Sequence, residues 1–180
     1  MSTTTAPMTV DEFLSLPDIE EQRVELIEGE VVDMPTGGPD HERVKSNLNE
    51  ILVLCLVKHG VGKVFIESGY RLAERSLLAP DISVLNLERI NQSGKDLLRG
   101  APDLAIEIVS SETANRLQTK IRLYFKHGAK AVWLIFLETR TIQVSHPDGH
   151  TVTLEQDRIL ENPDGLPGFS TPISAIFDRL

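Results

Sequence analysis

One segment limits the fold of this chain more than any other, the run DLAIEIVS from Asp103 to Ser110. Its apolar side chains fall on both alternating faces, which is the pattern of a strand that is buried on each side of its sheet. Residues 131–137 have the same character, and a segment with helical periodicity lies between the two runs. Two such strands joined through a helix indicate an α/β fold with a mixed sheet.

The other predicted elements surround these two strands. Apolar residues at helical spacing predict a long helix that begins at Asp40 and a second helix at 115–127. Thr9 and Glu12 have the spacing of a capping box, which predicts a short helix near the N-terminus. Alternating segments predict strands at residues 23–28, 30–34, 61–67, 70–73, 80–87 and 141–145. The sequence also predicts a loop at 88–100 that can include a helical turn, and a helical turn at 173–177. The three strands within 61–87 are expected to form a meander.

Length and composition favour one globular unit. A chain of 180 residues has the length of a single domain, and 41% hydrophobic with 25% charged residues is an ordinary globular composition. We therefore expect a flexible N-terminal tail at residues 1–8 and one domain at 9–180, an α/β fold with a mixed β-sheet flanked by helices. The longest apolar runs are far shorter than the roughly 20 residues that a membrane span needs. Because the N-terminus also lacks the pattern of a signal peptide, we expect a cytoplasmic protein with no membrane partner.

The charge balance restricts the kinds of function that fit. The formal net charge is −9, from 18 basic and 27 acidic residues. This balance argues against a protein that coats nucleic acid through bulk positive charge. It is compatible with an acidic site in which metal ions neutralise the carboxylates. The single cysteine, Cys55, excludes an internal disulfide and a zinc site built from several thiolates.

Glu107 is the residue whose chemistry conflicts most with its position. It lies in the middle of the predicted central strand, between Ile106 and Ile108. A buried carboxylate without a partner costs several kcal/mol, so something must compensate its charge. Three explanations fit this position: a bound cation, a basic side chain paired with Glu107, or a proton held by a raised pKa.

Two residues of other predicted elements are expected near Glu107. Pro80 cannot donate to a β-ladder, so it marks a strand end and places Asp81 at the rim of the sheet, unless Asp81 is only a turn residue. Lys120 lies on the flank of the apolar face of its helix. Its ammonium either extends to solvent or lies beside Glu107, where it would orient a water or stabilise charge on a substrate. Asp103 is about 13 Å from Glu107 along an extended strand, and we expect it to cap the strand instead.

Glu25 and His41 are further candidates for the site. Glu25 interrupts an apolar alternation, and either supplies another carboxylate or faces solvent. His41 opens the predicted long helix, and is either an ordinary loop residue or a contact to a phosphate. The sequence has no P-loop, dinucleotide-binding glycine motif, H-E-x-x-H motif or G-x-S-x-G elbow, which argues against the commonest nucleotide, zinc and serine enzymes. Several carboxylates with one lysine are instead the set needed to hydrolyse a phosphodiester with Mg²⁺ or Mn²⁺.

Five segments, in order along the chain, resemble the PD-(D/E)XK nuclease superfamily and more closely its Uma-two-type restriction endonucleases: VELIEGEVV, GPDHERV, APDISVL, APDLAIEIVSSET and KIRLYFKHGAKAVWLI. The resemblance runs from about Thr9 to Phe177 and implies a restriction-endonuclease-like fold. It also implies that Asp81 and Glu107 bind Mg²⁺, with Glu25 as a helper acid and third metal ligand.

The resemblance assigns the lysine and the function. Val109 stands where the superfamily signature has its lysine, whereas the similar family has a lysine on the following helix, here Lys120. The resemblance thus implies a Mg²⁺-dependent endonuclease, with Mn²⁺ as the other candidate cofactor, and we expect it to act on double-stranded DNA as a homodimer. The main alternative is a catalytically inactive nuclease-like module that binds nucleic acid or protein. Arg116 favours this alternative, since the family usually has an aspartate there. A third hypothesis is a metal-dependent phosphodiesterase that acts on small nucleotides.

Overall fold

The computed structural model describes residues 7–17, 19, 23–34, 36–92, 97–110, 112–161 and 166–178. The helices in these ranges are α1 (Val10–Leu14), α2 (Pro39–His59), α3 (Leu87–Gln92), α4 (Ala114–Lys126) and α5 (Ile173–Ile176). The strands are β1 (Val24–Ile27), β2 (Glu30–Asp33), β3 (Gly62–Ile66), β4 (Tyr70–Ala73), β5 (Ser76–Leu78), β6 (Ile82–Asn86), β7 (Leu98–Arg99), β8 (Leu104–Val109), β9 (Ala131–Phe136), β10 (Thr141–Ser145), β11 (Thr151–Leu154), β12 (Ile159–Glu161) and β13 (Ser170–Pro172).

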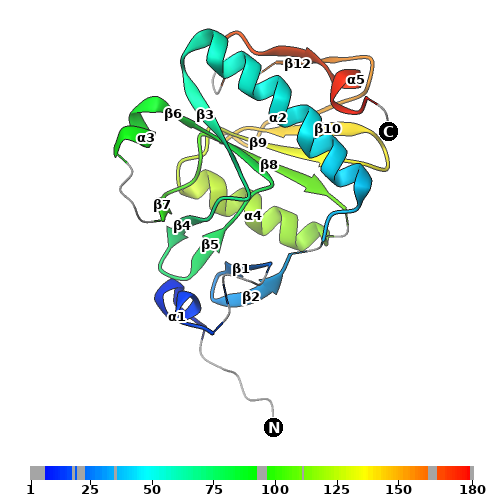
Figure 1. Cartoon of the computed structure of the whole chain (residues 1–180). Helices are drawn as coiled ribbons and strands as arrows, with labels where there is room; N and C mark the ends of the chain where they lie inside the picture. Colours follow the sequence, from blue (N-terminus) through cyan, green and yellow to red (C-terminus); the bar gives the residue numbers. More distant parts are fainter. Residues whose placement is uncertain are drawn as a thin grey trace.

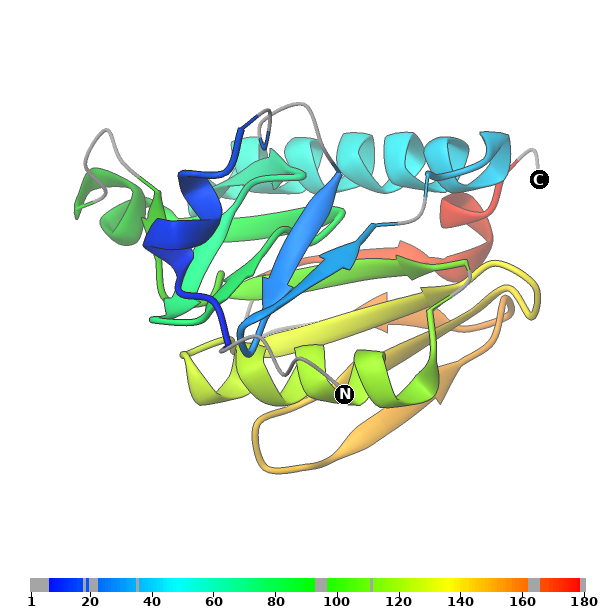
Figure 2. The same ribbon diagram turned by 90° about the horizontal axis from the view of Figure 1, so that it is seen from below.

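A six-stranded sheet forms the centre of the molecule, and the predicted mixed α/β architecture is confirmed (Figure 1). Its order is β11-β10-β9-β8-β6-β3, in which β8 and β9 are parallel and the other neighbouring pairs are antiparallel. Helix α2 covers one face of this sheet and α4 covers the other (Figure 2). Strands β8 and β9 lie between the two helices because their side chains are apolar on both faces.

Alternation along β8 decides which side chain faces which helix. Ile106 belongs to the core cluster that contains the buried face of α2. Ala105, the preceding residue, belongs to the cluster that contains the buried face of α4. Because side chains alternate with a period of two, Glu107 points to the α4 face, as Ala105 does. Lys120 of α4 is buried on that same face.

The predicted helices are confirmed to within two residues at each end. Thr9 and Glu12 form the predicted capping box: the Glu12 carboxylate accepts the Thr9 N–H at 2.7 Å, and Thr9 Oγ1 accepts the Glu12 N–H at 3.3 Å. Helix α2 is followed by Gly60, whose φ of 65° is the left-handed conformation that glycine adopts without strain. These ends follow from local chemistry, which is why the sequence predicts them well.

The prediction of a three-stranded meander at residues 61–87 is wrong. Strand β3 pairs with β6 in the six-stranded sheet, whereas β4 pairs with β5, a strand not predicted, in a second sheet of order β2-β1-β5-β4-β7. The chain passes from one sheet to the other at a turn that includes Glu67, whose φ is 45°. The predicted loop at 88–100 contains α3, in agreement with the helical turn allowed there, and also β7, which was not predicted. An alternating pattern predicts that a segment is extended, but it does not specify the partner strand.

The two ends of the chain differ in how they join the fold. Of the tail predicted at residues 1–8, residues 1–6 lie outside the described residues, whereas the Met8 N–H donates to the Gly29 carbonyl at 3.0 Å. At the other end, α5 confirms the predicted helical turn and packs in the same core cluster as α2. None of the described helices is both long and apolar enough to cross a membrane.

Asp103 caps the start of β8, as predicted, and we expect its replacement to destabilise the fold. Its carboxylate accepts the Asn86 N–H at 2.9 Å and pairs with the Lys130 ammonium at 3.0 Å. Asp103→Ala leaves the half-buried Asn86 donor without this acceptor, so we expect a loss of about 1–2 kcal/mol in the free energy of unfolding. Urea denaturation at pH 7 measures this loss. The exposed Asp33, changed to alanine, is the control and should shift stability by less than about 0.5 kcal/mol.

The same variant has a defined pH dependence. Burial by itself raises the pKa of Asp103, but the Asn86 N–H and the Lys130 ammonium outweigh burial, so the net pKa is lowered. A carboxylate with a lowered pKa stabilises the folded state above its unfolded pKa, and that contribution is lost as the pH falls through the folded pKa. The stability difference between wild type and Asp103→Ala should therefore shrink in acid, and a difference that grows there would contradict this role.

Candidate active site

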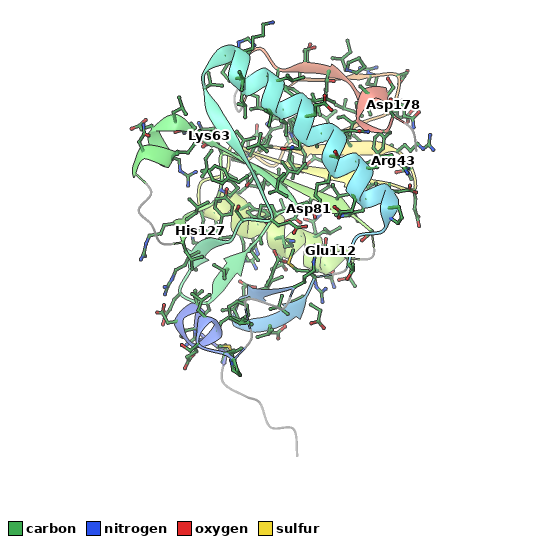
Figure 3. All side chains as sticks on the ribbon, viewed as in Figure 1. Arg43, Lys63, Asp81, Glu112, His127 and Asp178 are labelled. Atoms are coloured by element: carbon green, nitrogen blue, oxygen red, sulfur yellow. The ribbon has the colours of Figure 1, made fainter. Side chains whose placement is uncertain are left out.

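A pocket opens at the rim of the six-stranded sheet, where the C-terminal end of β8 meets β1, α4 and the start of α2. The empty space in and in front of it, open solvent included, is about 340 Å³. Asp81 and Glu112 mark its position in Figure 3. The residues that line it are Arg23, Glu25, Met34, His41, Asp81, Glu107, Ile108, Ser110, Glu112 and Lys120. All five residues that the sequence singled out for the site therefore line one pocket.

The register of β6 against β8 brings the two predicted metal ligands together. Ile82 pairs with Ile106 in antiparallel register. Continuing that register by one position places Asp81, at the rim just before β6, beside Glu107. Residues directly opposite in an antiparallel pair have Cβ atoms about 5 Å apart and share a face of the sheet. Asp81 also accepts the backbone N–H of Ile108 at 2.7 Å, which ties it to the same strand.

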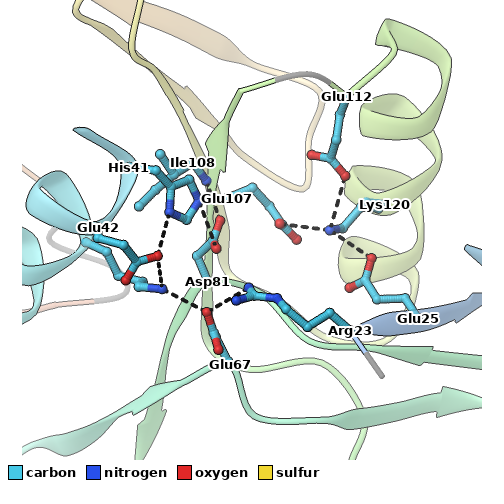
Figure 4. Close-up of polar contacts among 11 residues, drawn as sticks. Arg23, Glu25, His41, Glu42, Glu67, Asp81, Glu107, Ile108, Glu112 and Lys120 are labelled. Carbon is cyan, nitrogen blue, oxygen red and sulfur yellow. Dashed lines mark hydrogen bonds and ion pairs between the residues drawn. The ribbon is translucent and has the colours of Figure 1, made fainter. Parts of the chain in front are cut away.

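Glu107 is compensated by protein groups. Its side chain is 4% exposed, and its Oε2 atom lies 2.8 Å from Lys120 Nζ (Figure 4). The Tyr124 hydroxyl donates to its Oε1 atom at 2.6 Å. Of the three explanations for a buried acid at this position, the structure thus contains a basic partner, and the predicted contact between Lys120 and Glu107 is confirmed. Burial of Glu107 alone does not require a metal ion.

Lys120 is surrounded by more carboxylates than one ammonium can neutralise. Its side chain is 2% exposed, and Nζ lies 3.1 Å from Glu25 Oε2 in addition to its contact with Glu107. Glu112 Oε1 is 3.7 Å away, which is too long for a hydrogen bond. Glu25 is held from its other oxygen by the Ala79 N–H, which donates to Oε1 at 2.8 Å. The two short contacts leave the third ammonium proton without a close partner among the described residues.

His41 lies on the first turn of α2 and joins Asp81 to a peripheral network. Its Nε2 atom lies 3.2 Å from Asp81 Oδ1, and its Nδ1 atom lies 3.2 Å from Glu42 Oε1. The residue is only 5% exposed. Since both ring nitrogens have carboxylate neighbours, a contact from His41 to a phosphate would require one of them to be exchanged. The network continues through Lys45, whose Nζ atom lies 2.8 Å from Glu42 Oε1 and 2.7 Å from Glu67 Oε1. Figure 4 labels these two glutamates.

The surplus of acid shifts the ionisation of the central groups. Burial raises the pKa of Glu107 to about 8, although the Lys120 ammonium acts against the rise. Burial likewise raises the pKa of Glu25, and Lys120 offsets only part of it. For Lys120, burial acts to lower the pKa, but the surrounding carboxylates outweigh it and the net pKa is raised. An ammonium shared by several buried acids therefore stays charged while the acids bind protons more tightly than usual.

At the rim, the pKa shifts of Asp81 and His41 both favour the charged form of the group. Burial raises the pKa of Asp81, but His41 and the Ile108 N–H outweigh burial and the net pKa is lowered. The hydrogen bond to Asp81 raises the pKa of His41 above its ordinary value, against the effect of burial. Of Glu25, Asp81 and Glu107, Asp81 is therefore the acid that is most readily ionised.

Comparison with known proteins identifies the family. Residues 10–174 match the Uma2 family, which is described as "Putative restriction endonuclease". The chain belongs to the Uma2 family. A crystal structure described as "a putative nuclease belonging to DUF820", from Anabaena variabilis ATCC 29413, is similar with a TM-score of 0.84 and 27% sequence identity, over 95% of this chain and 98% of that chain. No curated protein matches the sequence significantly. The resemblance inferred from the five segments is confirmed for the family and for the fold.

The Uma2 site offers oxygen ligands that suit a divalent metal ion, but not a complete set of protein ligands around one. Carboxylates such as Asp81 and Glu107 suit Mg²⁺, which keeps several waters in its coordination shell. Within the described ranges, no group of three or more His, Cys, Asp and Glu side chains is close enough together to hold an ion. Glu25 contacts Lys120, so the structure does not gather it with the other two as a third ligand. The residues fit a cation held by two carboxylates and water.

Tyr124 and Glu112 are residues of the Uma2 site that the sequence analysis missed. Tyr124 follows Lys120 by four residues on α4, so both side chains lie on one face of the helix and reach Glu107 together. The spacing of four residues between Lys120 and Tyr124 is visible in the sequence and could have indicated this contact. Glu112 lies before α4 and had no periodic signal at all. Arg116 does not line the pocket: it faces Glu28 and Glu30 in a separate hollow.

Proposed function

We propose that this Uma2 protein is a Mg²⁺-dependent endonuclease that hydrolyses phosphodiester bonds of double-stranded DNA, with Mn²⁺ as a substitute ion. One observation carries the proposal: Glu25, Asp81 and Glu107 are buried carboxylates around one pocket, and Lys120 is the buried ammonium among them. Even with His41 protonated, the acids outnumber the bases. A divalent cation supplies the missing positive charge, which is the condition under which such a site is most stable.

Each residue has a proposed role in this reaction. Asp81 and Glu107 would hold the ion, which when bound polarises a phosphoryl oxygen and lowers the pKa of a water. Lys120 donates its remaining ammonium proton to a water or to a phosphoryl oxygen as negative charge develops there. Glu25 keeps the Lys120 side chain in place through its 3.1 Å contact. His41 orients the Asp81 carboxylate, in preference to the direct phosphate contact expected from the sequence.

The proposal extends to the oligomeric state and the cellular location of the protein. Cleavage of both strands of a duplex is simplest when two sites are related by a twofold axis, so we propose that the active form is a homodimer. We also keep the expectation of a cytoplasmic enzyme with one domain at residues 9–180. Size-exclusion chromatography with light scattering, with and without DNA, measures the oligomeric state directly.

Metal binding at Asp81 is the test of the proposed function. Isothermal titration with Mn²⁺ should show one site in the wild-type protein, and Asp81→Asn should weaken binding by about tenfold or more because it removes a ligand charge. Asp33→Asn is the matched control, because Asp33 is exposed and outside the pocket. Plasmid DNA should be nicked by wild type with Mg²⁺ or Mn²⁺ and left intact when EDTA is present.

The alternative, an inactive nuclease-like binding module, has its own supporting observation. All four carboxylate oxygens of Asp81 and Glu107 already have a close partner in the protein. Such a module needs no ion, so it should bind Mn²⁺ equally weakly in wild type and Asp81→Asn and should leave plasmid DNA uncut under all conditions. A phosphodiesterase for small nucleotides would instead hydrolyse a chromogenic diester and leave the plasmid intact.

A further inference from the structure

A second hollow lies beside the pocket of the candidate active site, called here the catalytic pocket, and shares part of its lining. Arg23 and Met34 line both of them. The second hollow, called here the side groove, runs from these two residues between α1 and the turn after β3, and has about 1080 Å³ of empty space including the solvent at its mouth. Ala79, whose backbone N–H holds Glu25, also lines it. A molecule bound in the catalytic pocket can therefore extend into the side groove.

The side groove is apolar, unlike the catalytic pocket. Leu14, Val24 and Leu77 line it together with Met34. Leu14 is 42% exposed, although it ends a helix whose other apolar residues are buried. Apolar side chains next to an acidic pocket are suited to the part of a substrate that is flat and uncharged. In DNA that part is the base, which stacks on apolar and aromatic side chains once it leaves the duplex.

Arg23 stands at the boundary between the two hollows. Its Nη2 atom pairs with Glu67 Oε1 at 3.0 Å, and the side chains are 41% and 35% exposed. An ion pair this exposed contributes little to stability, so a phosphate can replace Glu67 as the partner of Arg23 without a large cost. Glu67 would keep the Lys45 ammonium, which lies 2.7 Å away. A cation between an acidic pocket and an apolar groove is placed to bind the phosphate that joins a cleaved nucleotide to its neighbour.

The overall charge favours a source of DNA affinity other than bulk attraction to phosphates. With a net charge of −9, the chain offers little of the bulk phosphate attraction on which duplex-binding proteins usually depend. We propose that the side groove binds a single nucleobase that is out of the duplex stack, next to the phosphodiester in the catalytic pocket. This inference rests on the proposed nuclease function. It makes duplex DNA with an unpaired nucleotide the better substrate, because a paired base must first be unstacked.

Binding of two matched DNAs tests the inference without requiring cleavage. The probes are a duplex with one bulged 2-aminopurine and the same duplex with that 2-aminopurine paired to thymine, in metal-free buffer with wild-type protein. We expect the bulged duplex to bind about tenfold more tightly and its 2-aminopurine fluorescence to change on binding. Leu14→Gln should reduce this preference by about threefold or more. Leu54→Gln, an exposed leucine on α2, is the matched control.

The outcomes separate this inference from the proposed function. A preference for the bulged duplex that Leu14→Gln reduces, in a protein that cuts neither DNA with Mg²⁺, supports the side groove and overturns the nuclease proposal. Cleavage of both DNAs at equal rates, with equal binding and no effect of Leu14→Gln, overturns the side groove and leaves the nuclease proposal standing. Equal binding of the two DNAs is also the result expected if another part of the chain or a protein partner fills the groove, and it too overturns the inference.

Discussion

Glu107→Gln is expected to abolish metal-dependent DNA cleavage, with a loss of at least about 100-fold in rate. Glutamine has almost the same shape as glutamate, and its carbonyl oxygen can still accept the Tyr124 hydroxyl. It carries no charge, so one of the two proposed ligands no longer attracts a divalent cation. Initial rates of plasmid nicking at saturating Mg²⁺ measure the loss. Cleavage at the wild-type rate by this variant would remove Glu107 from the proposed mechanism.

The control for Glu107→Gln is Asp103→Asn. Asp103 belongs to the same segment, is also buried and hydrogen-bonded, but does not line the pocket. Its replacement should lower stability and leave the rate of nicking at 25 °C close to that of wild type, provided that the protein remains folded. A comparable loss of nicking in both variants would show that any substitution in this segment impairs activity. It would then give no evidence that Glu107 has a specific role in cleavage.

The pH dependence of stability gives Glu107→Gln a second readout. The folded-state pKa of Glu107 is raised to about 8 by burial. A carboxyl group with a raised pKa binds its proton more tightly in the folded state, so ionisation of this group destabilises the fold as the pH rises from its unfolded pKa to about 8. We expect metal-free wild type to lose this contribution between pH 5 and pH 8, and Glu107→Gln to lack the loss. Urea denaturation across that range measures both slopes.

Lys120→Met should have the largest effect on stability, about 3–5 kcal/mol in the free energy of unfolding, together with loss of cleavage. Methionine fills a similar volume, but Glu25 and Glu107 then remain buried without their shared cation. Thermal and urea denaturation in metal-free buffer measure the loss. Addition of Mg²⁺ should return part of it, since the ion becomes the compensating charge.

Two further variants isolate the charge of Lys120. Arg122→Met lies on the same helix, but its partner Glu28 and its own side chain are about half exposed, so it should cost less than about 1 kcal/mol. Lys120→Met combined with Glu25→Gln and Glu107→Gln should regain most of the lost stability, because no buried carboxylate is then left unpaired. A triple variant as unstable as Lys120→Met would show that methionine packs poorly there and that charge is not the cause.

The local pattern of the sequence was sufficient for several parts of the structure. The apolar character of β8 and β9 on both faces required a helix on each side of the sheet, and α2 and α4 are those helices. A carboxylate in the middle of β8 required a cation, a basic partner or a proton, and the flank position of Lys120 made this lysine one candidate partner. These inferences succeeded because burial, periodicity and charge compensation act on neighbouring residues and do not depend on long-range topology.

Other parts were decided only when distant segments came together. The passage of β4 and β5 into a second sheet, the Tyr124 contact with Glu107 and the side groove each depend on which elements pack against each other. Glu25 was predicted as a carboxylate of the site, but only the position of β1 over α4 turns it toward Lys120. The sequence determined which residues cannot be buried alone. The tertiary structure determined the partners that compensate them, because pairing energies depend on distances between elements far apart in the chain.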